Sequence, residues 1–373
     1  MAHQDQIQFI HFRYFKNNMQ SLAVLMPLLP SANIVHEPCD GIMLYSFATL
    51  QAPDVFLEVE RSKTRSIFIA GGPHPSARPE ETLRFFDYVV IGEGEETLPE
   101  LIKILKNGED VSSVMGIAFK DKNGIFFTEK REHVMLDRYP PFDINGARST
   151  IEITRGCPFS CAYCQTQQLF GHRMRHRNID EIAIYAKFLK DVRFTSPNAF
   201  AYGSDGIHPR IEKIEALLKN LPRKNIFFGT FPSEVRPEFI NDRILELVSA
   251  YCANTTLSLG GQSGSQRILD LIHRGHTVED IIEGVEKCLQ HGFTPVVDFI
   301  FGLPGETEDE QLETLRLIQW ITGKGGKVHS HYFMKLPGTE FENSTPAPLS
   351  VLIGKTMGKL ALFGKTTGVW SKA

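Results

Sequence analysis

The sequence has no run of about 18 apolar residues, so we expect no segment to span a bilayer. Its first residues, MAHQDQIQFIHF, lack the basic region and apolar core of a signal peptide, which predicts a cytoplasmic protein. The sequence also has no large excess of positive or negative charge. The net charge is −4 and the pI is near 6.4, so composition gives no support for binding nucleic acid or an anionic membrane. The 373 residues, 42% of them hydrophobic, suffice for two domains.

Cysteine is sparse, with six residues in the whole chain. Cys39, Cys252 and Cys288 are scattered, and we interpret them as reduced, buried thiols. The other three fall within the stretch IEITRGCPFSCAYCQ, residues 151–165, in the spacing C-x3-C-x2-C. Apolar and polar residues alternate at its start, which predicts a short half-buried strand, and Gly156 and Pro158 then break regular structure. We therefore expect the cysteine triplet in a loop directly after a strand.

Three interpretations of the triplet are open from the residues. Cysteines at i, i+4 and i+7 share one helical face and could pack as small hydrophobes, but Pro158 disfavours a helix through the loop. A structural zinc site needs four ligands, and the nearby imidazoles are those of His172 and His176. Iron with sulfide suits thiolate ligands better, and a cluster held by three cysteines leaves one iron free to bind something else.

The triplet, with the aromatic Tyr163 before its third cysteine, resembles the signature of the radical S-adenosylmethionine (SAM) enzymes. The resemblance implies that Cys157, Cys161 and Cys164 hold a [4Fe-4S] cluster whose remaining iron binds SAM, and that Tyr163 lies against the adenine. It implies that the reduced cluster cleaves SAM to a 5'-deoxyadenosyl radical. A reductant such as flavodoxin or ferredoxin is then expected as a partner.

Residues 1–112 alternate short apolar runs with helical patterns. The predicted strands are 7–12, 41–47, 66–71 and 87–92, and the predicted helices are 18–29, 53–61 and 96–106. Near-continuous apolar strands between helices indicate a parallel sheet covered on both faces, an α/β doubly wound (Rossmann-like) domain. Ligands of such sheets bind beyond the carboxyl ends of the strands.

Two predicted strand ends carry unusual residues. Gly71 and Gly72 follow one strand, where glycines either form a tight turn or let a ligand approach the backbone closely. Glu93 opens an acidic helix start after the other, which on its own complements the helix dipole. The phrases SIFIAGGPHPSARPEET and FDYVVIGEGEETLPEL are similar to the cobalamin-binding domain of one radical SAM class, which implies cobalamin contacts at Gly71, Gly72 and Glu93. Since D-x-H-x-x-G is absent, we expect cobalamin without a protein histidine ligand, and His74 as no metal ligand.

Residues 113–142 read as a β-hairpin, with an Asn-Gly turn, and a linker, which places the domain boundary near Asp143. The period of strand and helix then resumes over 143–373. Strands are predicted at 192–196, 225–230, 255–260, 295–302 and 328–334, with helices near 178–190, 208–220, 238–250, 277–290 and 307–322. With the strand before the cysteines this makes six β/α units, matching the (β/α)6 partial TIM barrel of radical SAM enzymes, and active groups belong in the loops after its strands.

The resemblance also implies SAM contacts in later strand-end loops. Gln262, where the family commonly has Glu, can still bond ribose hydroxyls, and Arg274 can pair with the SAM carboxylate if it is not simply a surface residue. Ile300 and Gly302 lie in DFIFGLPGET, whose backbone would meet adenine. The family's Gly-Gly-Glu motif is replaced here by a segment in which the expected contacts are Ser196 and Asn198. The basic run 173–177 is either a solvated face or an anion-positioning group.

These features predict a radical SAM enzyme that uses cobalamin for methylation of, or rearrangement on, an unactivated carbon of a small-molecule substrate. Two alternatives stay open. One is a methylthiotransferase, although the chain has no length for the extra RNA-binding domain usual in that group. The other is a non-catalytic iron-sulfur or cobalamin carrier. Residues 335–373 match no pattern, and the catalytic residues are unknown.

Overall fold

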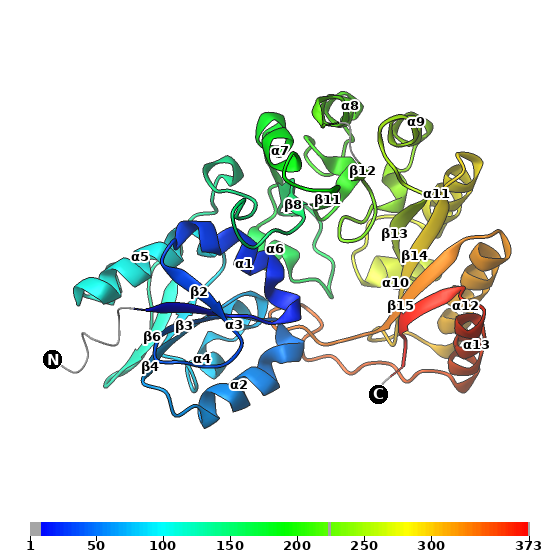
Figure 1. Cartoon of the computed structure of the whole chain (residues 1–373). Coiled ribbons are helices and arrows are strands. Elements are labelled where there is room, and N and C mark those ends of the chain that lie inside the picture. Colours follow the sequence, from blue (N-terminus) through cyan, green and yellow to red (C-terminus); the bar gives the residue numbers. More distant parts are fainter. Residues whose placement is uncertain (1–8, 223–224, 372–373) are drawn as a thin grey trace. The chain divides into compact units, whose positions relative to one another are not determined.

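The computed structural model describes residues 9–222 and 225–371, so residues 7 and 8 of the first predicted strand lie outside it. The chain forms two compact units, Met1–Thr150 with Gln168–Phe170, and Ile151–Gln167 with Gly171–Ala373 (Figure 1). The division follows Thr150, whereas the sequence placed the boundary near Asp143. No helix among the described residues has the length and apolar character needed to cross a membrane.

The first unit is built on a seven-stranded sheet with the order β2-β1-β3-β4-β5-β6-β7. Its strands are β1 (Ile10–Arg13), β2 (Ala32–Val35), β3 (Gly41–Ser46), β4 (Ser66–Gly71), β5 (Tyr88–Val90), β6 (Ile117–Asp121) and β7 (Gly124–Phe127). β1 to β5 run parallel, which confirms the predicted doubly wound domain. The hairpin β6–β7, expected in a connecting segment, extends this sheet through antiparallel pairing with β5. The edge strand β2 was not predicted because it is short and two of its four residues are exposed.

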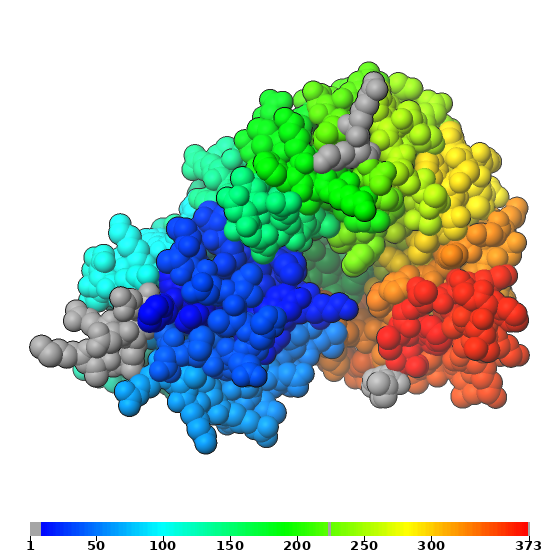
Figure 2. Space-filling model, in the orientation of Figure 1, coloured from blue at the N-terminus to red at the C-terminus, as the bar shows by residue number. Residues whose placement is uncertain are grey.

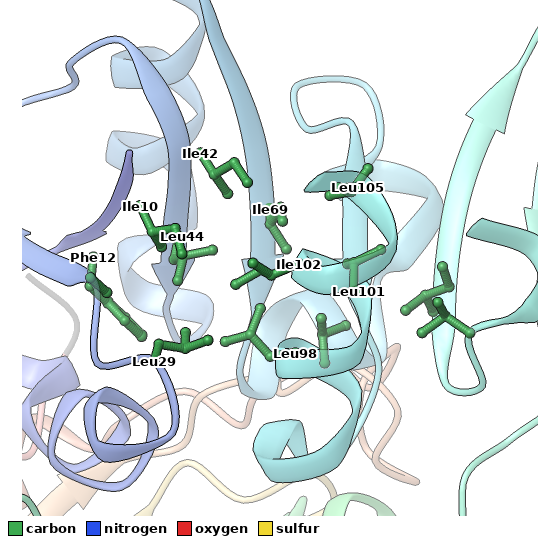
Figure 3. Packing of buried hydrophobic residues seen from close by; sticks show 14 of the residues in the cluster. Ile10, Phe12, Leu29, Ile42, Leu44, Ile69, Leu98, Leu101, Ile102 and Leu105 are labelled. Atoms are coloured by element: carbon green, nitrogen blue, oxygen red, sulfur yellow. The ribbon is translucent and has the colours of Figure 1, made fainter. Parts of the chain in front are cut away.

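Helices on both faces bury the two sides of this sheet. They are α1 (Met19–Leu25), α2 (Ala52–Arg61), α3 (Pro73–Ala77), α4 (Pro79–Thr82) and α5 (Gly94–Asn107). Successive side chains of a strand point to opposite faces, so β3 supplies both cores. Ile42 and Leu44 pack in one cluster with Leu101 of α5 (Figure 3), and Met43 and Tyr45 pack in the other.

The second unit is an open arc of parallel strands (Figure 1). Its sheets have the orders β12-β11-β8 and β13-β14-β15-β16. The strands are β8 (Ile151–Glu152), β11 (Asp191–Thr195), β12 (Asn225–Phe227), β13 (Thr256–Gln262), β14 (Thr294–Phe301), β15 (Lys327–Tyr332) and β16 (Thr366–Val369). Ser258 N–H donates to the Gly229 carbonyl at 2.9 Å, which joins the two sheets into one arc. The six predicted strands are all present, and the partial barrel is confirmed.

Helices cover the outer side of the arc (Figure 1): α7 (Ile179–Ala186), α8 (Ile211–Asn220), α9 (Asp242–Tyr251), α11 (Val278–Gln290), α12 (Glu308–Gly323) and α13 (Val351–Leu362). The short helix α10 (Gln266–Leu271) instead follows the carboxyl end of β13. The side chains of β14 alternate between the two faces of the sheet. Val297 and Phe299 are fully buried, whereas the alternate residues Asp298 and Ile300 are half-buried on the opposite face of the strand. Asp298 therefore stands on the concave side of the barrel, away from the covering helices (Figure 1).

The C-terminal segment that the sequence left unassigned folds into α13 and β16. β16 pairs with β15 and adds a strand beyond the six predicted units. Gly354 and Gly358 lie inside α13, and glycine weakens a helix by about 1 kcal/mol relative to alanine, which is why no helix was predicted there. Figure 2 shows this segment, coloured red, on the molecular surface, where Leu362 and Phe363 are 86% and 78% exposed.

Candidate active site

The cysteine triplet lies in the loop between β9 (Thr154–Arg155) and α6 (Thr166–Phe170), at the carboxyl end of the first barrel strand. The loop is held by backbone hydrogen bonds. Cys157 N–H donates to the Gly171 carbonyl at 3.1 Å, and Ala162 N–H donates to the Ile272 carbonyl at 3.1 Å. The C-terminal segment also holds it, since Gln165 Nε2 donates to the Pro337 carbonyl at 2.7 Å. The loop is thus fixed from three parts of the second unit.

All three thiols of the triplet are free, with Cys161 buried and Cys157 and Cys164 half-buried. Burial raises the pKa of the Cys157 thiol, and the charge of Arg236 opposes that effect. In the described part of the chain, no three His, Cys, Asp or Glu side chains converge on one metal ion. A [4Fe-4S] cluster does not need such convergence, because each cysteine binds a different iron.

Two arginines bring positive charge to the triplet. Arg274 Nη1 lies 3.9 Å from Cys161 Sγ, and its Nη2 donates to the Gly260 carbonyl at 2.9 Å. The Arg236 guanidinium stacks on the Phe159 ring, 3.5 Å from its centroid, and donates to the Arg274 carbonyl. A cluster held by thiolates is anionic, so buried cations beside the sulfurs fit such a group. A structural zinc site needs four ligands, and the described residues around the triplet supply no fourth one.

The predicted contacts Ser196 and Asn198 differ in whether their side chains are available to hydrogen-bond a ligand. Ser196 Oγ is 2.8 Å from Ser233 Oγ and is satisfied within the chain. Asn198 is 3% exposed, and its Oδ1 accepts hydrogen bonds from Phe200 N–H and Arg236 N–H at 3.2 and 3.4 Å. Its Nδ2 has no acceptor among the described residues. A buried amide donor without a partner is costly, so Asn198 Nδ2 is available to a ligand.

Of the other predicted SAM contacts, Tyr163 lies in the cysteine loop, Gln262 ends β13, Ile300 lies on β14 and Gly302 directly follows β14. Gln262 is buried and has a φ of 70°, and Ile300 is half-buried on the concave side. Both polar backbone groups of Gly302 are used within the chain, because its N–H donates to Glu306 at 2.7 Å and its carbonyl accepts from Ala347 N–H at 3.0 Å. The N–H of Gly302 is therefore not available to a ligand, whereas its carbonyl keeps a second lone pair.

The basic run 173–177 has a structural use. Arg175–His176 form β10, which pairs with β9. His176 Nε2 donates to the Ser204 carbonyl at 2.7 Å, which leaves Nδ1, 3.0 Å from Thr154 Oγ1, as an acceptor. Arg177 Nε donates to the Glu152 carbonyl at 3.0 Å. These contacts stabilise the base of the cysteine loop.

Sequence reasoning missed an acidic pair inside the barrel, Glu234 and Asp298. Burial and the nearby charge of Glu234 raise the pKa of Asp298, because two close carboxyl groups do not both ionise easily. Glu234 also acts electrostatically on His331 of β15, and Arg274 acts on Asp298. Asp298 could have been recognised from the sequence, because it is an acidic residue within the apolar run of β14. No sequence feature marks Glu234 or Arg236 as a site residue.

In the first unit, the loops after β3, β4 and β5 meet at the carboxyl edge of the sheet. Phe47 N–H donates to the Gly71 carbonyl at 3.2 Å, and Gly92 N–H donates to Ser76 Oγ at 2.9 Å. Gly72 has a φ of 95° and packs against Ser46 and Phe47. The chain's own packing thus accounts for glycine at position 72, and the cobalamin contacts at Gly71 and Gly72 stay a prediction.

His74 and Glu93 are used inside the first unit. The His74 imidazole is buried, with ring centroids 5.9 Å from Phe47 and 5.7 Å from Phe56, and burial lowers its pKa. Neither ring nitrogen has a hydrogen-bond partner among the described residues, although Nε2 lies 3.7 Å from Glu81. Glu93 Oε2 accepts a hydrogen bond from Val134 N–H at 2.7 Å, which ties the strand-end loop to the segment after the hairpin.

Alanine at Gly72 should destabilise this edge, whereas alanine at Gly71 should not. An added Cβ at Gly72 would lie 2.9 Å from Ser46 Oγ in a backbone region that other residues avoid, and we expect a loss of about 2 kcal/mol. At Gly71 the nearest atom would be 3.8 Å away, so the change should stay within about 0.5 kcal/mol. Hydrogen exchange of the β3 and β4 amides measures both, and equal protection in the two variants would contradict the expectation.

Family models match both units of the chain. Residues 151–318 match the radical SAM superfamily, and residues 32–102 match the B12 binding domain. The first match contains the cysteine loop and the strands up to β14, together with most of α12. The second contains the three strand-end loops that meet at the carboxyl edge of the first sheet.

Individual relatives share modest identity with the chain. An uncharacterised methyltransferase of Pyrococcus horikoshii is 27% identical over 282 residues, which cover 69% of this chain and 59% of the relative. A tRNA-2-methylthio-N(6)-dimethylallyladenosine synthase of Moorella thermoacetica is 28% identical over 246 residues, covering 62% of this chain and 50% of the synthase. The chain thus spans between half and three fifths of the length of these two relatives.

Among solved structures, the radical SAM methyltransferase TsrM of Kitasatospora setae, with cobalamin and a [4Fe-4S] cluster bound, has a similar fold. The TM-score is 0.69 at 15% identity, and the match covers 90% of this chain and 74% of TsrM. At this identity the likeness concerns the fold, and it extends across both units of the chain.

Proposed function

The chain belongs to the radical SAM superfamily and carries a B12-binding domain, and on this premise we propose that it is a cobalamin-dependent radical SAM methyltransferase. The observation that carries the proposal is the loop of three free cysteines at the carboxyl end of the first barrel strand, with two arginines beside it. Three thiolates with no fourth ligand suit a cluster that keeps one iron open to a substrate.

In this proposal Cys157, Cys161 and Cys164 are the cluster ligands. When bound, the reduced cluster supplies the electron that cleaves SAM. Arg274 then has two tasks. Its position beside Cys161 offsets the charge of the thiolates, and its Nε, which has no partner among the described residues, is free to donate to the SAM carboxylate.

Other side chains would orient the rest of SAM. Asn198 Nδ2 is an unused buried donor for a carboxylate or hydroxyl oxygen, and Gln262 can bond ribose hydroxyls. Ile300 and Tyr163 offer apolar surface to adenine. The acidic pair Glu234 and Asp298, partly buried in the barrel, can accept hydrogen bonds from ligand hydroxyl or ammonium groups.

The first unit would hold cobalamin. Gly71 leaves room for the backbone approach that the nucleotide tail needs, because an added Cβ there would lie 3.8 Å from the nearest atom, and Glu93 fixes the neighbouring loop through Val134. We infer that the His74 imidazole does not reach cobalt, because it is packed between phenylalanine rings. The substrate of TsrM is tryptophan, and for this chain we likewise propose a small molecule, methylated at or rearranged around an unactivated carbon.

Two other candidate functions can be distinguished from the proposed one by experiment. The relative from M. thermoacetica makes a methylthiotransferase the second candidate. A carrier that binds cofactors without reacting is the third. A low-potential electron carrier, such as flavodoxin or ferredoxin, is the proposed physiological reductant.

The test is chromatography for 5'-deoxyadenosine after anaerobic reconstitution and reduction with dithionite. Wild-type protein should form it from SAM, at least about tenfold above a Cys161→Ala variant. An intact cluster that gives no product above this control would support the carrier instead. Transfer of sulfur together with the methyl group to added RNA would support the methylthiotransferase.

A further inference from the structure

Arg236 is a buried cation beside the cysteine loop that no part of the proposed SAM site uses. Its side chain is 4% exposed, stacked on Phe159 and bonded to the Arg274 carbonyl. Its charge acts on both Cys157 and Cys161. In the described part of the chain its Nη1 has no acceptor, so part of its charge is not neutralised by a direct contact.

Glu238 is the anion paired with this cation. Its Oε1 accepts from Arg236 Nε at 2.5 Å, and its Oε2 has no donor among the described residues. His276 does not supply one. Its Nε2 donates to the Gly261 carbonyl at 3.2 Å, so its Nδ1, 3.7 Å from Glu238, carries no proton, and burial lowers the pKa of His276 to about 2. Arg236 and Glu238 thus form an ion pair whose cation lies against Phe159 of the cysteine loop.

We infer that Arg236 and Glu238 are positioning residues that set the reduction potential of the cluster, Arg236 raising it and Glu238 lowering it. The inference rests on the proposed function, since it concerns the cluster held by the triplet. Reduction adds one electron to the cluster, which a nearby cation stabilises and a nearby anion destabilises. Charges several ångströms apart in a buried site interact by about 1 to 2 kcal/mol, enough to shift the equilibrium about tenfold.

The pair allows a test in which the two substitutions have opposite signs. Arg236→Gln removes the cation and should make reduction about tenfold less favourable, a shift of about 59 mV toward negative potential. Glu238→Gln removes the anion and should shift the potential toward positive values by a comparable amount. It should also fold well, because the new amide can donate to the unprotonated His276 Nδ1. The double variant restores the balance of charge and should lie near the wild type.

The measurement is a potentiometric titration of the reconstituted full-length protein, followed by electron paramagnetic resonance in the presence of redox mediators. Arg243→Gln is the matched control, since Arg243 lies on the outer helix α9 with its side chain 54% exposed. Iron content is measured first for each protein. Wild-type protein without iron would contradict the proposed function itself, not the role of Arg236.

With a wild-type cluster in place, the outcomes decide the inference. Opposite shifts for Arg236→Gln and Glu238→Gln, with Arg243→Gln unchanged, are expected. Shifts of the same sign in both variants would mean that disturbed packing, not charge, moves the potential. No shift in Glu238→Gln, which retains the Arg236 contact at Oε1, would also overturn the inference.

Discussion

Alanine at Cys161 should leave the protein unable to hold iron after anaerobic reconstitution, against about four irons per chain in the wild type. Cys161 is buried in the loop and lies beside Arg274, and alanine removes its sulfur without supplying another ligand. Two thiolates cannot retain a cluster of four irons against chelators. The same result is expected for Cys157→Ala and Cys164→Ala.

Iron and acid-labile sulfide analysis measures this effect. Cys252→Ala is the matched control, because Cys252 is a free, half-buried thiol that follows α9 on the outer side of the barrel. Retention of full iron by Cys161→Ala, or loss of iron in Cys252→Ala as well, would remove the triplet from its assigned role. Stoichiometric zinc in the wild type would do the same.

The second large effect is expected at Arg274, where Arg274→Gln should weaken SAM binding by about 10- to 150-fold. The range follows from a charged hydrogen bond, worth about 1.5 to 3 kcal/mol, which a neutral amide does not supply. Arg274→Lys keeps the charge but not the planar fork, so its loss should be smaller. Equilibrium binding of SAM to cluster-loaded protein measures both variants.

Arg267→Gln is the control for Arg274, because it comes from the same stretch but its side chain is 57% exposed and pairs with Glu310. Its SAM affinity should match the wild type. If Arg274→Gln retains both iron and full SAM affinity, then Arg274 serves only the loop, through its bond to the Gly260 carbonyl. Equal losses in Arg267→Gln and Arg274→Gln would indicate a general disturbance of the segment.

The sequence predicts those features that depend on residues close together in the chain. Near-continuous apolar runs such as 41–46 predict buried parallel strands, and in the structure β3 is buried along its whole length. The spacing of the cysteines, with Pro158 among them, correctly predicts a loop directly after a strand. The helix expected near 307–322 is α12, which begins at Glu308 and is capped by Thr307, whose Oγ1 accepts from Glu310 N–H.

Features that depend on residues far apart in the chain could not be predicted from the sequence. The contact between Arg236 and Arg274 joins residues 38 positions apart, and nothing local marks Arg236 as a neighbour of the cysteines. The pairing of Glu234 with Asp298 joins a loop to a strand in the same way. β16 was missed because TTGV is short and three of its four residues are exposed, so that its apolar pattern is weak.

The central claim is that the triplet holds an iron-sulfur cluster with one iron open to SAM. Electron paramagnetic resonance of the dithionite-reduced, reconstituted protein, recorded without and with SAM, tests it most directly. We predict a [4Fe-4S] signal whose shape changes when SAM is added and that is absent in Cys161→Ala. A signal unchanged by saturating SAM would contradict the open iron, and a reconstituted wild-type protein with no such signal would contradict the cluster itself.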